Sequence, residues 1–101
     1  MATILLSEIL NDNDYANGGT VVYDIAQSAI ANNDIIVIDM QNVDSVPTVF
    51  MNTSFGKLMD IFGVDRIKKS FRFKNILKTQ VERISKYFSD YESLLKMNGW
   101  V

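Results

Sequence analysis

Hydrophobic residues occur along this chain in short clusters separated by polar segments, and their spacing predicts alternating strands and helices. The segment Ala2 to Leu10 is rich in Ile and Leu and predicts a first strand, or a strand followed by a turn. The Asn, Asp and Gly residues of segment 11–19 favour a loop, because these residue types adopt turn conformations easily. From Thr20, which can cap the first turn, the spacing predicts a helix that ends near residues 32–33.

The central part of the chain has the clearest pattern. Ile35 to Met40 is a continuous run rich in β-branched residues, which predicts a strand buried on both faces of a sheet. After a loop over Gln41 to Val46, Pro47 and Thr48 favour the start of a helix. A core-facing helix is expected from there to Gly63, because hydrophobic residues recur at helical spacing: Met51, Phe55, Leu58, Met59 and Phe62.

The last third of the chain predicts one more strand and one more helix. Phe71 and Phe73 alternate with Arg72, which is typical of a strand. A last helix is expected from about Thr79, with a core face formed by Val81, Ile84, Phe88, Tyr91 and Leu95. The order β, α, β, α, β, α predicts an α/β fold, with helices packed on a small mixed, mostly parallel sheet and right-handed crossovers. No linker or repeat divides the chain, so residues 1–101 are expected to form a single domain.

Two residue types are absent, and their absence excludes most self-contained active sites. The 101 residues include no Cys and no His. Thiolate nucleophiles, disulfides and thiolate metal sites are therefore excluded, and the commonest general acid/base near neutral pH is missing. We expect a protein that is not an enzyme and that holds neither a metal nor a cofactor. No apolar stretch approaches the roughly 20 residues that span a bilayer, which predicts a cytoplasmic protein without a membrane segment.

Charge is segregated along the chain. Residues 1–56 carry seven acids and no base, whereas residues 57–101 carry ten bases against five acids. Such asymmetry marks a docking face for an acidic partner or for nucleic acid, unless the two halves simply compensate each other in the fold. A nucleic-acid interface within segment 66–86 would use Arg66, Lys68, Lys69, Arg72, Lys74 and Lys78, with Phe71, Phe73 and Tyr87 as stacking groups. The net charge of -2 counts against this alternative.

One pair of carboxylates could run general acid/base chemistry without His. Asp39 ends the central strand and Asp44 lies in the loop after it, where open α/β sheets often bind ligands. Asp is also an ordinary turn or capping residue at such places. A small enzyme that uses this pair is the least favoured of the alternatives, and we expect no catalytic residue.

The run from Ile38 to Thr48 and the helix after it are similar to a segment of STAS domains, the fold of anti-anti-sigma factors. In that segment a strand ends in Asp, a loop carries a Val, and a Ser or Thr opens the next helix. More closely, Val46-Pro47-Thr48-Val49-Phe50 with Asn52-Thr53-Ser54-Phe55-Gly56-Lys57-Leu58 resembles the STAS-like bacterial family of unknown function, and Phe71-Arg72-Phe73-Lys74-Asn75 resembles its later strand. The resemblance covers roughly Gly18 to Ser89.

The resemblance implies a STAS-like fold and a regulatory module that binds other proteins. In anti-anti-sigma STAS proteins, a kinase-like ATPase of the GHKL type phosphorylates the hydroxyl residue that opens this helix, and phosphorylation breaks the complex. Thr48 falls at that position and is the candidate phosphorylation site, although Pro47-Thr48-Val49-Phe50 replaces the Asp-Ser-Ser-Gly run of the family. A plain capping role for Thr48 is the alternative. The expected partner surface comprises Asp39, Asn42, Asp44, Ser45, Pro47, Thr48 and Asn52.

Overall fold

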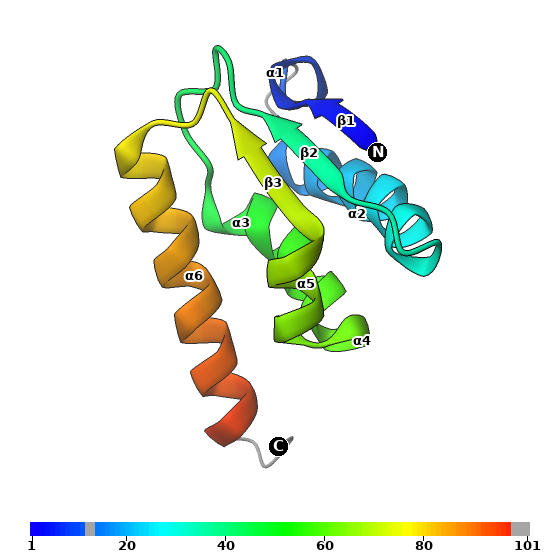
Figure 1. Cartoon of the computed structure of the whole chain (residues 1–101). Coiled ribbons are helices and arrows are strands. Elements are labelled where there is room, and N and C mark those ends of the chain that lie inside the picture. Colours follow the sequence, from blue (N-terminus) through cyan, green and yellow to red (C-terminus); the bar gives the residue numbers. More distant parts are fainter. Residues whose placement is uncertain (12–13, 98–101) are drawn as a thin grey trace.

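The computed structural model describes residues 1–11 and 14–97 and confirms the α/β fold (Figure 1). Three short strands, β1 (Ala2–Leu5), β2 (Ile36–Asp39) and β3 (Phe71–Lys74), form a parallel sheet in the order β1-β2-β3. Ala2 pairs with Ile36, and Ile36 with Phe71. The helical segments are α1 (Leu6–Ile9), α2 (Tyr15–Ala31), α3 (Thr48–Met51), the π-helical turn η1 (Asn52–Gly56), α4 (Lys57–Phe62), α5 (Val64–Ser70) and α6 (Lys78–Met97).

Helices cover one face of the sheet. Figure 1 shows α2 and α3 behind the strands, and α6 beside β3. Ile36 and Ile38 of the central strand are fully buried toward these helices. Val37 on the other face is only partly buried, so the strand is confirmed but its expected burial on both faces is wrong, because no helix of the described residues covers that face. Alternate residues of the strands point to the opposite face, where Leu5, Arg72 and Lys74 are exposed.

An aromatic cluster joins the helices to β3. Phe55 of η1 lies at its centre and is 1 % exposed. Its ring contacts the rings of Phe50, Phe71, Phe73 and Phe88 in edge-on arrangements, with centroid separations of 6.2, 5.2, 6.2 and 5.3 Å. Because Phe88 belongs to α6, this cluster also joins the last helix to β3 and η1.

The start of α2 differs from the sequence-based expectation. The loop predicted over residues 11–19 is wrong for its second half, because α2 begins at Tyr15 and includes Gly18 and Gly19. Asp14 is the N-cap, with Oδ1 accepting from Asn17 N at 3.1 Å, whereas the Thr20 hydroxyl donates to Ala16 O inside the helix at 3.2 Å. Residues 12–13 of the predicted loop lie outside the described residues.

Gly19 lies in a helix because α2 packs very closely on the π-helical turn. A Cβ atom at Gly19 would overlap Thr53 Oγ1 and would lie 2.5 Å from Phe50 O. The Thr53 hydroxyl also donates to Ala16 O of α2 at 3.0 Å. The glycine pair therefore provides room for a helix contact instead of forming a turn.

Two further differences concern helices. The helical segment that begins at Thr48 ends before Gly63, as expected, and the left-handed φ of 87° at Gly63 suits a residue without a Cβ. A further helix, α5, then follows where none was predicted. In α6, Val81 was expected on the core face but is 43 % exposed, and Gln80 is buried in its place.

Candidate functional site

The segment that follows β2 lies between two grooves. It runs from Gln41 through Pro47 into α3, and it contains most of the expected partner surface. One groove, of about 460 Å³, separates the start of α3 from α6. The other, of about 210 Å³, separates the loop from α1 and the start of α2. The structure therefore divides the expected partner surface between two recesses.

Thr48 is the first residue of α3, and its hydroxyl does not cap the helix. The N-cap is Pro47, and no side chain caps this terminus. Instead, Thr48 Oγ1 accepts a hydrogen bond from Arg83 Nη2 at 3.3 Å. The same guanidinium donates from Nε to Val46 O at 2.7 Å, which fixes it beside the exposed hydroxyl. The capping alternative for Thr48 is therefore wrong in this fold.

The groove beside Thr48 carries charges of both signs. Its lining is Thr48, Met51, Thr79, Glu82, Arg83, Lys86, Tyr87 and Asp90. Lys86 Nζ lies 2.8 Å from Asp90 Oδ2, and both side chains are largely exposed. Such an exposed pair contributes little to stability, so Lys86 is available to another anion.

A stripe of long polar side chains on α6 holds that helix against segment 43–60. Gln80 Nε2 donates to Val43 O at 2.6 Å, and Arg83 Nε donates to Val46 O. Tyr87 OH donates to Asn52 Oδ1 at 2.7 Å, and Tyr91 OH donates to Asp60 Oδ1 at 2.8 Å. Four contacts thus connect α6 to the segment that carries Thr48.

The two tyrosines of this stripe remain protonated well above neutral pH. Burial, with a smaller contribution from the Asp60 carboxylate, raises the pKa of Tyr87 to about 12. Burial and the hydrogen bond to Asp60 raise the pKa of Tyr91 further. Both phenols therefore act as hydrogen-bond donors, and the side-chain oxygen of the exposed Asn52, part of the expected partner surface, is already bonded to Tyr87.

Asp39 is a structural residue at the ends of β2 and β3. Its Oδ1 accepts from Asn75 Nδ2 at 2.9 Å and from Gln41 N at 3.0 Å, and Lys74 Nζ lies 3.8 Å from Oδ2. The hydrogen bond from Asn75, then that from Gln41, and the charge of Lys74 hold the pKa of Asp39 below its usual range against the effect of burial. Asp39 is 9 % exposed and so presents little surface to a partner.

Asp39→Asn is expected to lower stability at pH 7 and to make stability less dependent on pH. Because the folded pKa is depressed, the carboxylate stabilises the fold above its unfolded pKa of about 4, and this contribution is lost as pH falls toward the folded value. Urea unfolding followed by circular dichroism at neutral and acidic pH measures both effects. The exposed Asp44→Asn is the matched control. Equal pH dependence in Asp39→Asn and the wild type would contradict this role.

The two carboxylates weighed for acid/base chemistry face different surroundings. Asp39 contacts Asn75 and Lys74, whereas Asp44 lines the smaller groove with Asn42, Ser45 and Tyr15. Within residues 1–11 and 14–97, no group of three or more acidic side chains could hold a metal ion. Asp39 is thus held by contacts inside the fold, whereas Asp44 lies at an exposed groove.

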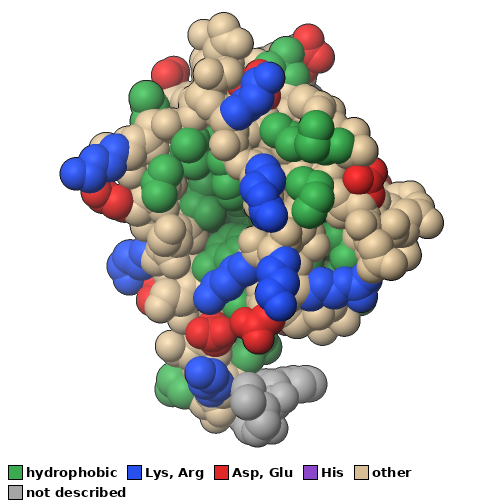
Figure 2. All heavy atoms as spheres, viewed as in Figure 1, with side chains coloured by type: hydrophobic (Ala, Val, Ile, Leu, Met, Phe, Trp, Pro, Cys, Tyr) green, Lys and Arg blue, Asp and Glu red, His purple; other side chains and the backbone are tan. Residues whose placement is uncertain are grey.

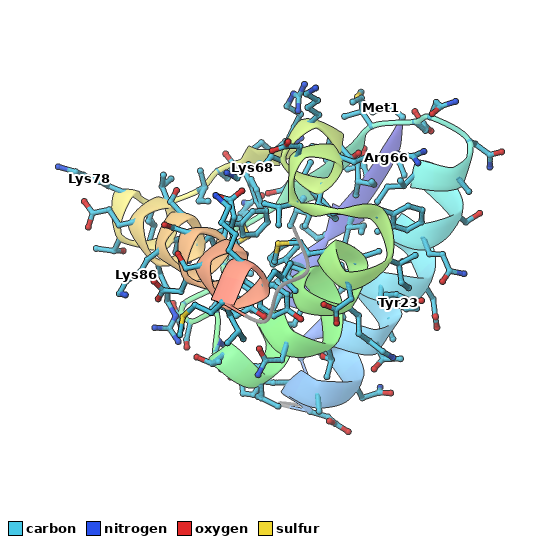
Figure 3. The ribbon with its side chains drawn as sticks, turned by 90° about the horizontal axis from the view of Figure 1, so that it is seen from below. Met1, Tyr23, Arg66, Lys68, Lys78 and Lys86 are labelled. Carbon is cyan, nitrogen blue, oxygen red and sulfur yellow. The ribbon has the colours of Figure 1, made fainter. Side chains whose placement is uncertain are left out.

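The basic residues of segment 66–86 are spread over several surfaces. Figure 3 shows Lys78 and Lys86 on α6 at one side of the molecule and Arg66 at the other. Arg66 Nη2 donates to Ile30 O at the end of α2, at 2.8 Å, and its guanidinium lies over the ring of Phe62. The Phe71 ring, weighed as a stacking group, is buried in the core.

Sequence reasoning missed the contribution of α6 to the site. Arg83, Lys86 and Tyr87 surround Thr48 and Asn52, but they lie some 35 residues away in the chain. A signal was present in the helical spacing of Gln80, Arg83 and Tyr87, which places three long polar side chains on one stripe. Spacing alone does not say which segment that stripe contacts.

In the part of the chain that the structure describes, no helix is both long and apolar enough to cross a membrane. Among known protein families, residues 18–80 match one described as a STAS-like domain of unknown function. No curated protein and no solved structure matches the chain.

Proposed function

The chain belongs to the family of STAS-like domains of unknown function, and on that premise we propose that it is a non-catalytic regulatory module. It binds another protein through the loop 41–47 and the start of α3. Phosphorylation of Thr48 by a kinase-like ATPase of the GHKL type, or by another kinase, switches this binding. Because ATP is the phosphoryl donor, the switch works in the cytoplasm.

The observation that carries the proposal is the Thr48–Arg83 contact. The Thr48 hydroxyl is exposed, is not consumed by helix capping, and lies 3.3 Å from a guanidinium nitrogen. A kinase needs an accessible hydroxyl, and a phosphate needs a cation within reach once it is attached. Thr48 meets both conditions.

A phosphate on Thr48 changes the groove in a defined way. It adds about -1.5 to -2 charges and three strong acceptor oxygens. Arg83 then exchanges its hydrogen bond to the hydroxyl for stronger bonds to the phosphate. The phosphate also competes with the Asp90 carboxylate for Lys86. The surface of α3 that a partner contacts becomes anionic while α6 is held more tightly to it. A partner that recognises the neutral surface is released.

The test begins with capture of the tagged protein from its native cells, with and without ATP, followed by mass spectrometry of the partner and of the Thr48 peptide. Thr48→Glu is expected to weaken partner binding by about tenfold or more, because a carboxylate partly reproduces the phosphate charge. Thr48→Val is expected to bind like the wild type. Thr79→Glu, which adds the same charge in the same groove, is the matched control.

Two results would count against this function. Equal partner binding by Thr48→Glu and the wild type would remove Thr48 from the mechanism. Recovery of nucleic acid in place of a protein, with affinity that falls steeply as salt is added, would favour the interface in segment 66–86.

A further inference from the structure

Strand β3 is an edge of the sheet, and part of its outer edge is unpaired. Lys74 O accepts from Met40 N of the chain after β2, at 2.9 Å, so the peptide groups of Arg72 and Lys74 face β2. Those of Phe71 and Phe73 therefore point away from the sheet. Phe71 O accepts from the side chain of Arg72 at 2.9 Å, while no described residue hydrogen-bonds the backbone of Phe73. An additional strand would find a free donor and acceptor there.

The space beside this edge is hollow and apolar. Figure 2 shows hydrophobic side chains at the bottom of a depression between α6 and β3. Phe73 is only partly buried, Leu77 just before α6 is 58 % exposed, and Val81 in its first turn is 43 % exposed. These side chains offer apolar surface that an extended segment would cover.

The elements on the two sides of the hollow carry bases. Arg72 and Lys74 belong to β3, Lys68 and Lys69 to the end of α5 just before it, and Lys78 opens α6 on the other side. No acid occurs in the chain from Arg66 to Val81. Figure 2 shows Lys and Arg side chains along the β3 side. Pairing of this edge with that of a second copy would bring like charges together, which disfavours a homodimer. The charge fits an acidic occupant.

We propose that an extended acidic segment of a partner protein adds to the sheet as a fourth strand beside β3, in the hollow between β3 and α6. This surface is separate from the Thr48 groove, and the inference does not require phosphorylation. The edge of β3 is thus a second contact through which the regulatory module holds its partner.

Strand addition explains the position of each group. The added backbone pairs with the N–H and C=O of Phe73, at the spacing of about 4.8 Å between neighbouring strands. Alternate side chains point inward onto Phe73 and Val81, and the others point outward to Arg72 and Lys74. Arg72 covers Phe71 O in the unbound protein and so protects the edge from unspecific pairing; a carboxylate of the incoming strand draws it away.

The test uses a pool of short synthetic peptides in which Glu alternates with a mixture of Val, Ile, Phe and Tyr. The second pool is identical except that Lys replaces Glu. The immobilised protein is expected to retain the Glu pool about tenfold more than the Lys pool. Arg72→Glu and Val81→Glu are each expected to reduce retention of the Glu pool about tenfold. Lys57→Glu makes the same charge change as Arg72→Glu but lies on α4 beside Tyr23, and this variant is expected to retain the Glu pool as well as the wild type does.

Hydrogen exchange separates strand addition from simple charge attraction. The amide of Phe73 is expected to become protected when the Glu pool is bound, because strand pairing engages that amide directly. The inference is overturned if the Glu pool is not retained, if it binds without protecting Phe73, if polyuridylate displaces it and protects nothing on β3, or if the free protein is a dimer through this edge. Thr48→Glu is expected to leave peptide retention unchanged, so the phosphoswitch and the strand site succeed or fail separately.

Discussion

Phe55→Ala is expected to lower the free energy of unfolding by about 4 kcal/mol, the range measured when a buried aromatic ring is truncated in a core. The ring of Phe55 contacts four other rings, from α3, from β3 and from α6. Its loss leaves a cavity between rigid elements that cannot close on one another. Small domains are stable by about 5–15 kcal/mol, so this loss leaves the variant with little remaining stability.

Urea unfolding followed by circular dichroism measures this loss. Phe62→Ala is the matched control, because Phe62 is half-buried and its ring packs against the Arg66 side chain at the surface. The control is expected to cost about 1 kcal/mol, in proportion to its smaller buried area. A cost for Phe55→Ala no larger than that of the control would mean that the aromatic cluster does not hold α6 to the sheet.

Gly19→Ala is expected to lower the free energy of unfolding by about 2–3 kcal/mol, although Gly→Ala in an exposed helix stabilises by about 1 kcal/mol. The added methyl would overlap Thr53 Oγ1 and would approach Phe50 O to 2.5 Å. The backbone carbonyl cannot rotate away, so α2 must move from α3 and η1. That movement also breaks the hydrogen bond from Thr53 Oγ1 to Ala16 O.

The neighbouring glycine supplies the control. A methyl at Gly18 meets the end of the flexible Leu10 side chain at 2.7 Å, which can move at small cost. Thermal unfolding of Gly18→Ala is therefore expected to remain near the wild-type midpoint. The midpoint of Gly19→Ala is expected to fall by about 10 °C or more, given about 4–8 °C per kcal/mol in a domain of this size. Similar midpoints for both variants would refute the close helix contact.

Periodicity in the sequence was enough to place β2, β3, the end of α2, the helical segment 48–62 and α6. Ile36 and Ile38 lie in a short run rich in β-branched residues, which favours a buried strand, and the hydrophobic residues from Met51 to Phe62 recur at helical spacing. Local physics decides such segments, because burying one continuous apolar face requires that backbone period. The position of Thr48 at the start of a helix follows for the same reason.

The start of α2 and the π-helical turn were decided by contacts. Asn17, Gly18 and Gly19 favour a turn in isolation, and only the approach of Thr53 and Phe50 makes glycine the residue that a helix needs there. In η1 the Ser54 hydroxyl donates to Phe50 O at 2.8 Å, which competes with the regular helical bond to that carbonyl.

The surroundings of the candidate site could not be predicted from the sequence, because they too depend on contacts between segments that are far apart in the chain. The sequence by itself determined that Thr48 opens a helix and that the second half of the chain is basic. Only the tertiary structure brought Arg83 to the Thr48 hydroxyl, turned Arg66 to the end of α2, and left Arg72 at a free strand edge. The charge of each residue can be read from the sequence. The residues that surround it depend on how α6 and the sheet pack, and hydrophobic periodicity does not specify which distant segments come into contact.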